Sequence, residues 1–91
     1  MASKPRPTET IDLTYEVEID GVSVDSLTMR RPTVRDQMIV DKMKGTDTEK
    51  AVKFFANLCE VSPSTIEALD TVDFTRLSEV LQDFQAPPST T

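Results

Sequence analysis

A strict alternation of apolar and polar side chains, followed at once by Asp20-Gly21, constrains the fold of this chain most. Between residues 11 and 19 every second position is apolar: Ile11, Leu13, Tyr15, Val17 and Ile19. This period of two is typical of an antiparallel strand with one buried face. Asp-Gly between two such runs favours a type I′ turn, because both central residues need positive φ. We therefore expect a β-hairpin over residues 11–30.

The return strand cannot keep its apolar side chains on one face along its whole length. Counted from the turn, Leu27 and Met29 fall on the solvent side. One extra residue in this strand near Asp25-Ser26 would return both to the core, so we expect a β-bulge there. The bulge would place Leu27 opposite Tyr15. Met29 would then lie opposite Leu13.

After Pro32 the spacing of apolar residues changes to that of amphipathic helices. Thr33 is suited to cap the first helix, whose apolar stripe includes Met38 and Ile39, and Gly45 is suited to end it in the left-handed conformation. Ser and Pro at positions 62 and 63 indicate another helix start. We expect helices over about residues 34–44, 49–60, 63–69 and 72–84.

This element order predicts an α+β fold, in which an N-terminal antiparallel β-hairpin is followed by three to four short α-helices. A chain of 91 residues supports one modest core, so we expect a single small domain at residues 11–84. The proline-containing ends cannot bury enough apolar surface to offset their ordering entropy. Residues 1–10 are therefore expected to form a flexible arm and residues 85–91 a disordered tail.

The sequence offers few groups for catalysis or for holding a cofactor. It contains no His, and its one cysteine, Cys59, lies in an apolar helical stripe where a buried small hydrophobe is favoured over a nucleophile. Its carboxylates lack the dense spacing of a metal loop, and Asp70 and Asp73 fit the first turn of the last helix as capping groups. We expect no enzymatic activity, no cofactor and no metal.

The charge of the chain also narrows its choice of partners. Ten basic and sixteen acidic residues give a net charge of -6, the wrong sign for binding nucleic acid. No apolar run approaches the ~20 residues of a membrane-spanning helix, so no membrane partner is expected either. A lone cysteine fits a reduced cytoplasm. Binding to other proteins is the activity that remains.

Five residues are candidates for contact with a partner: Arg30, Arg31, Met38, Phe54 and Phe55. Arg30 and Arg31 form the one local basic pair, which either pairs with the acidic strand opposite or docks an acidic partner. Phe54 and Phe55 are adjacent, so one helix stripe cannot bury both. Phe54 lies either at an interface or over the hairpin as ordinary core.

One segment resembles the signature of a known family. The run LTMRRPTV at residues 27–34, with Asp36 after it, is similar to the segment through which the hairpin passes into the first helix in Mu-like phage tail assembly chaperones. The second half, from Leu58 through Val61-Ser62-Pro63 to Phe84, resembles the later stretch of that family. The resemblance covers about residues 11–84.

The resemblance implies a non-catalytic protein of the infected host cytoplasm that binds the tape measure protein. Such a chaperone keeps its partner soluble, assists assembly of the tail tube and is absent from the mature virion. The tail tube protein is a further candidate partner, and the hairpin is a candidate surface for self-association. Two alternatives stay open: a minor structural tail protein of the virion, and an acidic inhibitor that imitates DNA.

Overall fold

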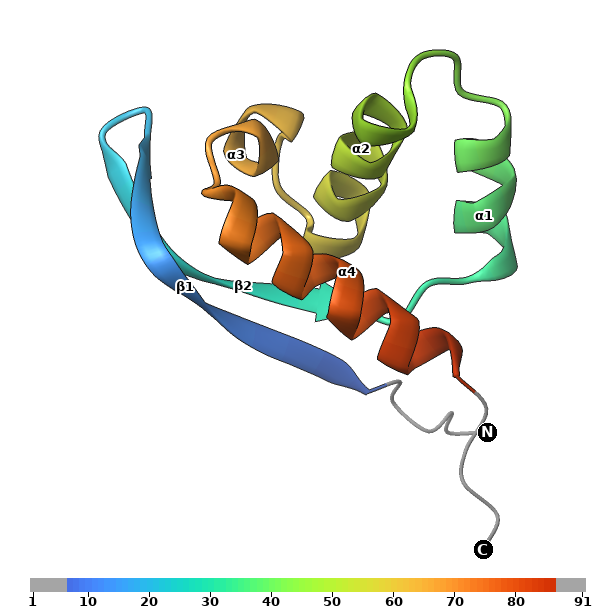
Figure 1. Ribbon diagram of the computed structural model, residues 1–91, viewed down its shortest axis with the longest axis horizontal. Coiled ribbons are helices and arrows are strands. Elements are labelled where there is room, and N and C mark those ends of the chain that lie inside the picture. Colours follow the sequence, from blue (N-terminus) through green and yellow to red (C-terminus); the bar gives the residue numbers. More distant parts are fainter. Residues whose placement is uncertain (1–6, 87–91) are drawn as a thin grey trace, which may run out of the picture.

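The computed structural model describes residues 7–86 and confirms the predicted α+β fold (Figure 1). The expected arm and tail fall largely outside the described residues, but β1 begins inside the expected arm. In Figure 1 the helices lie on one side of a long, curved hairpin, and α1 is at the opposite end of the molecule from the hairpin turn. The elements are β1 (Thr8–Ile19), β2 (Val22–Arg30), α1 (Val34–Asp41), α2 (Asp47–Cys59), α3 (Pro63–Glu67) and α4 (Thr71–Gln85).

The turn of the hairpin forms where the sequence predicts it. Asp20 has φ 52° and Gly21 has φ 79°, the positive values that a type I′ turn needs at both positions. Close to the turn, Ile19 pairs with Val22 and Val17 with Val24. The local sequence therefore determines the position of the turn and the register beside it.

The register breaks near the middle of the hairpin. Asp12 pairs with Ser26 and Val17 with Val24, so residues 13–16 of β1 stand opposite Asp25 alone. The irregularity lies beside Asp25, as predicted. The prediction that the extra residue belongs to β2 is wrong, because β1 carries the extra residues.

This difference changes the partners across the hairpin without exposing the core side chains. Leu27 lies opposite Ile11 rather than Tyr15, and Met29 lies opposite Glu9 rather than Leu13. An odd number of extra residues on either strand restores the parity of the side chains. Leu27 and Met29 are therefore still buried, whereas Tyr15 is 61% exposed, contrary to its expected place on the buried face.

The physical reason for the break is Asp73 of α4, whose carboxylate replaces β2 as the hydrogen-bond partner. The Thr14 N–H donates to both Asp73 carboxylate oxygens, at 2.9 and 3.1 Å, and the Tyr15 N–H donates to Oδ2 at 3.4 Å. Asp73 lies in the first turn of α4 as expected, but it bonds to β1 and is completely buried. Asp70 is the residue that caps α4, accepting from the Val72 N–H at 2.9 Å.

Capping side chains mark the starts of α1 and α2, but Gly45 does not mark the end of α1. The prediction that Gly45 ends the first helix is wrong, because α1 already ends at Asp41 and its C-cap is Lys42 in right-handed geometry. Gly45, with φ 127°, precedes Thr46, which forms a capping box with Glu49. This box starts α2 two residues earlier than expected.

One apolar core lies between the hairpin and the helices. Both adjacent phenylalanines of α2 are buried, because α2 is packed by α1, α3 and β2 on different sides. The Phe55 ring also meets the Phe74 ring edge-on, with centroids 5.4 Å apart. Phe54 thus belongs to the core. The buried apolar residues are Ile11, Leu27, Met29, Phe54, Phe55, Ala56, Leu58, Cys59, Ile66, Leu69 and Leu77.

Candidate docking surface

Helix α1 is attached to the rest of the fold by polar groups. Thr33 caps it, and the only fully buried residue of the helix is Asp36. Arg30 donates two hydrogen bonds to the Asp36 carboxylate, at 2.7 and 3.0 Å. Asn57 of α2 donates a third at 2.9 Å and the Thr33 N–H a fourth at 2.8 Å. The hydrogen-bonded Asp36 carboxylate therefore holds α1 in place. Val40, which is half-buried, is the one apolar residue of α1 that packs against the core.

The electrostatics of Asp36 agree with this attachment. The Arg30 guanidinium holds the pKa of the Asp36 carboxyl well below its usual range, with further help from the Thr33 donors, although burial opposes the shift. The pKa of Arg30 is raised, chiefly by the same hydrogen-bonded pair. Arg30 therefore pairs with Asp36 and not with the acidic strand opposite, which was one of the two alternatives for the basic pair.

The outer side of α1 exposes apolar and basic side chains together. At ~100° per residue, five of the exposed residues of α1 and its C-cap share an arc of about 140° on the side away from Asp36, and the exposed polar residues Gln37 and Asp41 lie beside that arc. Val34 is 78% exposed, Met38 53% and Ile39 47%. We call this surface the α1 face; it consists of Val34, Arg35, Met38, Ile39 and Lys42.

Two shallow depressions border this surface. One is lined by Arg35, Met38, Ile39 and Lys42 themselves. The other lies between the start of α1 and the end of α4, and includes Arg31, Val34 and Phe84. There the Arg31 guanidinium lies 5.7 Å from the centre of the Phe84 ring, within the range of a cation–π contact.

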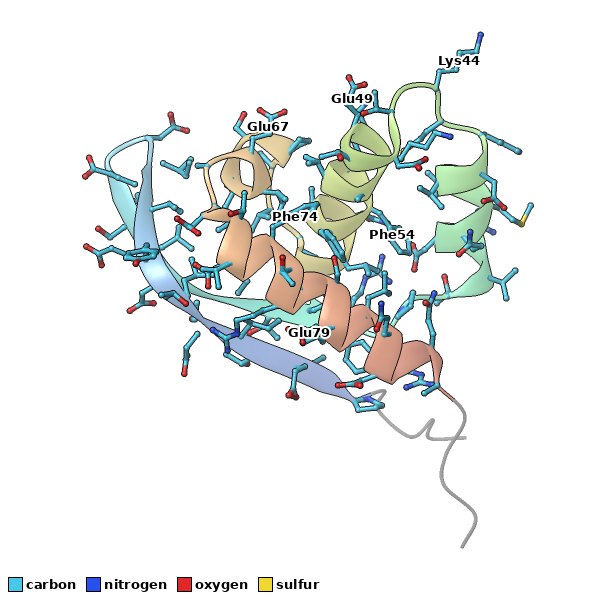
Figure 2. All side chains as sticks on the ribbon, viewed as in Figure 1. Lys44, Glu49, Phe54, Glu67, Phe74 and Glu79 are labelled. Atoms are coloured by element: carbon cyan, nitrogen blue, oxygen red, sulfur yellow. The ribbon has the colours of Figure 1, made fainter. Side chains whose placement is uncertain are left out.

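Exposed basic side chains lie on and beside α1, while Asp41, Asp47 and Glu49 are exposed at the same end of the molecule outside the α1 face. Arg35 is exposed on α1 and Lys42 at its C-cap, and Figure 2 shows Lys44 projecting outward from the α1–α2 link. The hairpin end carries further exposed carboxylates, among them Glu18 and Asp20, and no Lys or Arg lies close to its turn in the sequence. The α1 face is thus a basic, apolar surface on a chain whose net charge is -6.

The predicted partner-binding residues separate into two environments. Met38 lies on the α1 face and Arg31 borders it, whereas Arg30 forms an ion pair with Asp36 on the inner side of α1. Phe54 and Phe55, at 7% and 2% exposed, lie in the core and add nothing to the surface of the folded chain. Sequence reasoning missed the rest of the α1 face, although the spacing of Arg35, Met38, Ile39 and Lys42 at i, i+3, i+4 and i+7 was visible.

The described part of the chain shows little that supports a metal site, a reactive cysteine or a membrane-spanning helix. Within residues 7–86 no group of three or more acidic or Cys side chains is placed to hold a metal ion. Burial raises the pKa of the Cys59 thiol to about 11, which keeps it protonated and unreactive near neutral pH. None of the described helices has the length and apolar character needed to cross a membrane.

A small α+β fold with one basic, apolar helix surface defines a class of compact domains suited to contacts with other proteins. Over residues 10–85 the chain matches the family described as "Phage tail assembly chaperone proteins, E, or 41 or 14", and it belongs to that family. Membership indicates a non-enzymatic role and interaction with phage tail proteins. Neither the curated proteins nor the solved structures contain a significant match.

Proposed function

We propose that this chain binds the tape measure protein of its phage, keeps it soluble in the host cytoplasm and assists assembly of the tail tube without catalysis. The observation that carries the proposal is family membership over nearly the whole described chain, residues 10–85. The α1 face supports it, since apolar side chains in a basic setting are suited to covering apolar segments of another protein. Chaperones act by keeping such segments from aggregating.

Co-expression with the tape measure protein of the same phage tests this function. We expect the tape measure protein to be insoluble alone and to co-elute with this chain in size-exclusion chromatography. Light scattering on the complex then gives the number of copies per partner. A tape measure protein that stays soluble by itself and elutes separately would contradict the proposal.

The proposal also places the chain outside the finished particle. A denaturing gel or mass spectrometry of purified virions should show the tail proteins without this one. Its presence in stoichiometric amount would favour a minor structural tail protein instead. The two functions therefore give opposite results in one measurement.

A further inference from the structure

The apolar part of the α1 face is left about half uncovered or more by the rest of residues 7–86. Val34, Met38 and Ile39 are all about half exposed or more, on a helix of eight residues whose inner side is fixed by the Asp36 carboxylate. Among the other described helices, Val72 is the one large apolar residue with comparable exposure. The α1 face is thus the one helical surface of this kind in the described chain.

The spacing of the α1 face matches one side of a pair of packed helices. Arg35, Met38, Ile39 and Lys42 follow each other at i, i+3, i+4 and i+7, which places them along one ridge about two turns long. Within residues 7–86 neither Arg35 nor Lys42 takes part in an ion pair. The ridge therefore has an apolar centre and a cation at each end.

We propose that the α1 face receives an amphipathic helix of the tape measure protein whose apolar stripe is bordered by acidic side chains. This inference deepens the proposed function and rests on it for the name of the partner. Apolar side chains of the incoming helix would cover Met38 and Ile39, while its carboxylates meet Arg35 and Lys42. Elsewhere the net negative charge of the chain would repel such a helix, so charge selects both the segment and its site.

A second copy of the chain is a poorer occupant of this surface. A symmetric contact between two α1 faces would place Arg35 and Lys42 near the same cations of the other copy. The remaining described helices offer acidic side chains but no comparable apolar ridge. Charge complementarity therefore favours a different protein.

Two synthetic helical peptides test the proposal with the full-length chain. Both carry Leu at i, i+3, i+4 and i+7; one has Glu at the flanking positions and the other has Lys. By fluorescence anisotropy at low salt, we expect the Glu peptide to bind about tenfold more tightly or better, with a preference that falls as salt rises. Equal binding of both peptides, tighter binding of the Lys peptide, or no binding of either would overturn the proposal.

Variants with matched controls locate the contact. Arg35→Glu combined with Lys42→Glu should reverse the preference between the peptides, and Ile39→Asp should weaken binding of the Glu peptide about tenfold. Lys53→Glu and Val72→Asp are the controls, because Lys53 is exposed on α2 and Val72 is 46% exposed, close to the 47% of Ile39. Equal effects of test and control variants would refute the assignment to α1. Unchanged thermal melts show that each variant is folded.

The same variants separate this inference from the proposed function. If the wild-type chain keeps the tape measure protein soluble and the α1 variants do so equally well, the function stands and the docking surface is wrong. If the wild-type chain binds the Glu peptide but leaves the tape measure protein insoluble, the surface stands and the partner is wrong. Light scattering of the free chain gives its oligomeric state. If the chain is a dimer and the α1 variants are monomers, the α1 face binds a second copy and the proposal is overturned.

Discussion

Replacing Asp73 by Asn tests the hydrogen bonds that join α4 to the irregular part of β1. The Asp73 carboxylate accepts the Thr14 N–H at 2.9 and 3.1 Å and the Tyr15 N–H at 3.4 Å while being completely buried. A hydrogen bond to a charged group contributes roughly 1.5–3 kcal/mol, and the longer contact belongs at the low end. An Asn side chain keeps one acceptor and turns an N–H₂ group toward an N–H donor. We expect Asp73→Asn to lower the free energy of unfolding by about 2–4 kcal/mol.

Urea unfolding followed by circular dichroism at pH 7 measures this loss. Asp70→Asn is the matched control, because it makes the same chemical change three residues earlier, at an exposed N-cap where Asn and Asp are equally good. The control should change stability by less than about 0.5 kcal/mol. Amide exchange adds a local readout: the N–H groups of Thr14 and Tyr15 should lose protection in Asp73→Asn. A loss below about 0.5 kcal/mol, with protection retained, would refute the argument.

The pH dependence of stability checks the charge of Asp73. Burial acts to raise its pKa, but the hydrogen bonds from Thr14 and Tyr15 and the nearby Arg76 outweigh burial, so the pKa lies below its usual range. A carboxyl with a lowered folded-state pKa stabilises the fold above its unfolded pKa of about 3.9, and this contribution is lost as pH falls through the folded value. The difference in stability between the wild type and Asp73→Asn should therefore be smaller at pH 3 than at pH 6.

Three further substitutions or reactions test other parts of the fold. Arg30→Ala leaves the nearly buried Asp36 carboxylate without its cation and should cost about 2 kcal/mol in urea unfolding, a value reduced because Arg30 is itself about one third exposed. Glu60, the C-cap of α2, has φ 57°, a left-handed conformation that glycine adopts more readily, so Glu60→Gly should raise the free energy of unfolding by about 0.5–1 kcal/mol. A lower free energy of unfolding would contradict this prediction. Cys59 is buried with a raised pKa, so a thiol reagent should react with it at neutral pH only after denaturant is added.

The features that the sequence predicted correctly depend on near neighbours. Asp20-Gly21 specifies its turn within two residues, and the Thr33 cap needs only Asp36 three positions later. The position of the extra residues in the hairpin is different, because it depends on Asp73, which is 59 residues away from Thr14. Alternation shows that the parity must change, but it gives no sign of which strand bonds to a distant carboxylate. Pattern reasoning therefore located the irregularity and assigned it to the wrong strand.

The same difference explains why Met38 was the only residue of the α1 face predicted to contact a partner. An apolar stripe on a helix normally faces inward because burial of apolar area is the main stabilising contribution. Here the inner side of α1 carries Asp36, and a burial cost for that carboxylate is offset by Arg30 and Asn57, which come from β2 and α2. Once these polar bonds fix the helix, Met38 and Ile39 must point outward. A short helix held by a polar contact can therefore keep its apolar side for a partner, and on this chain the basic residues beside it indicate which partner helix fits.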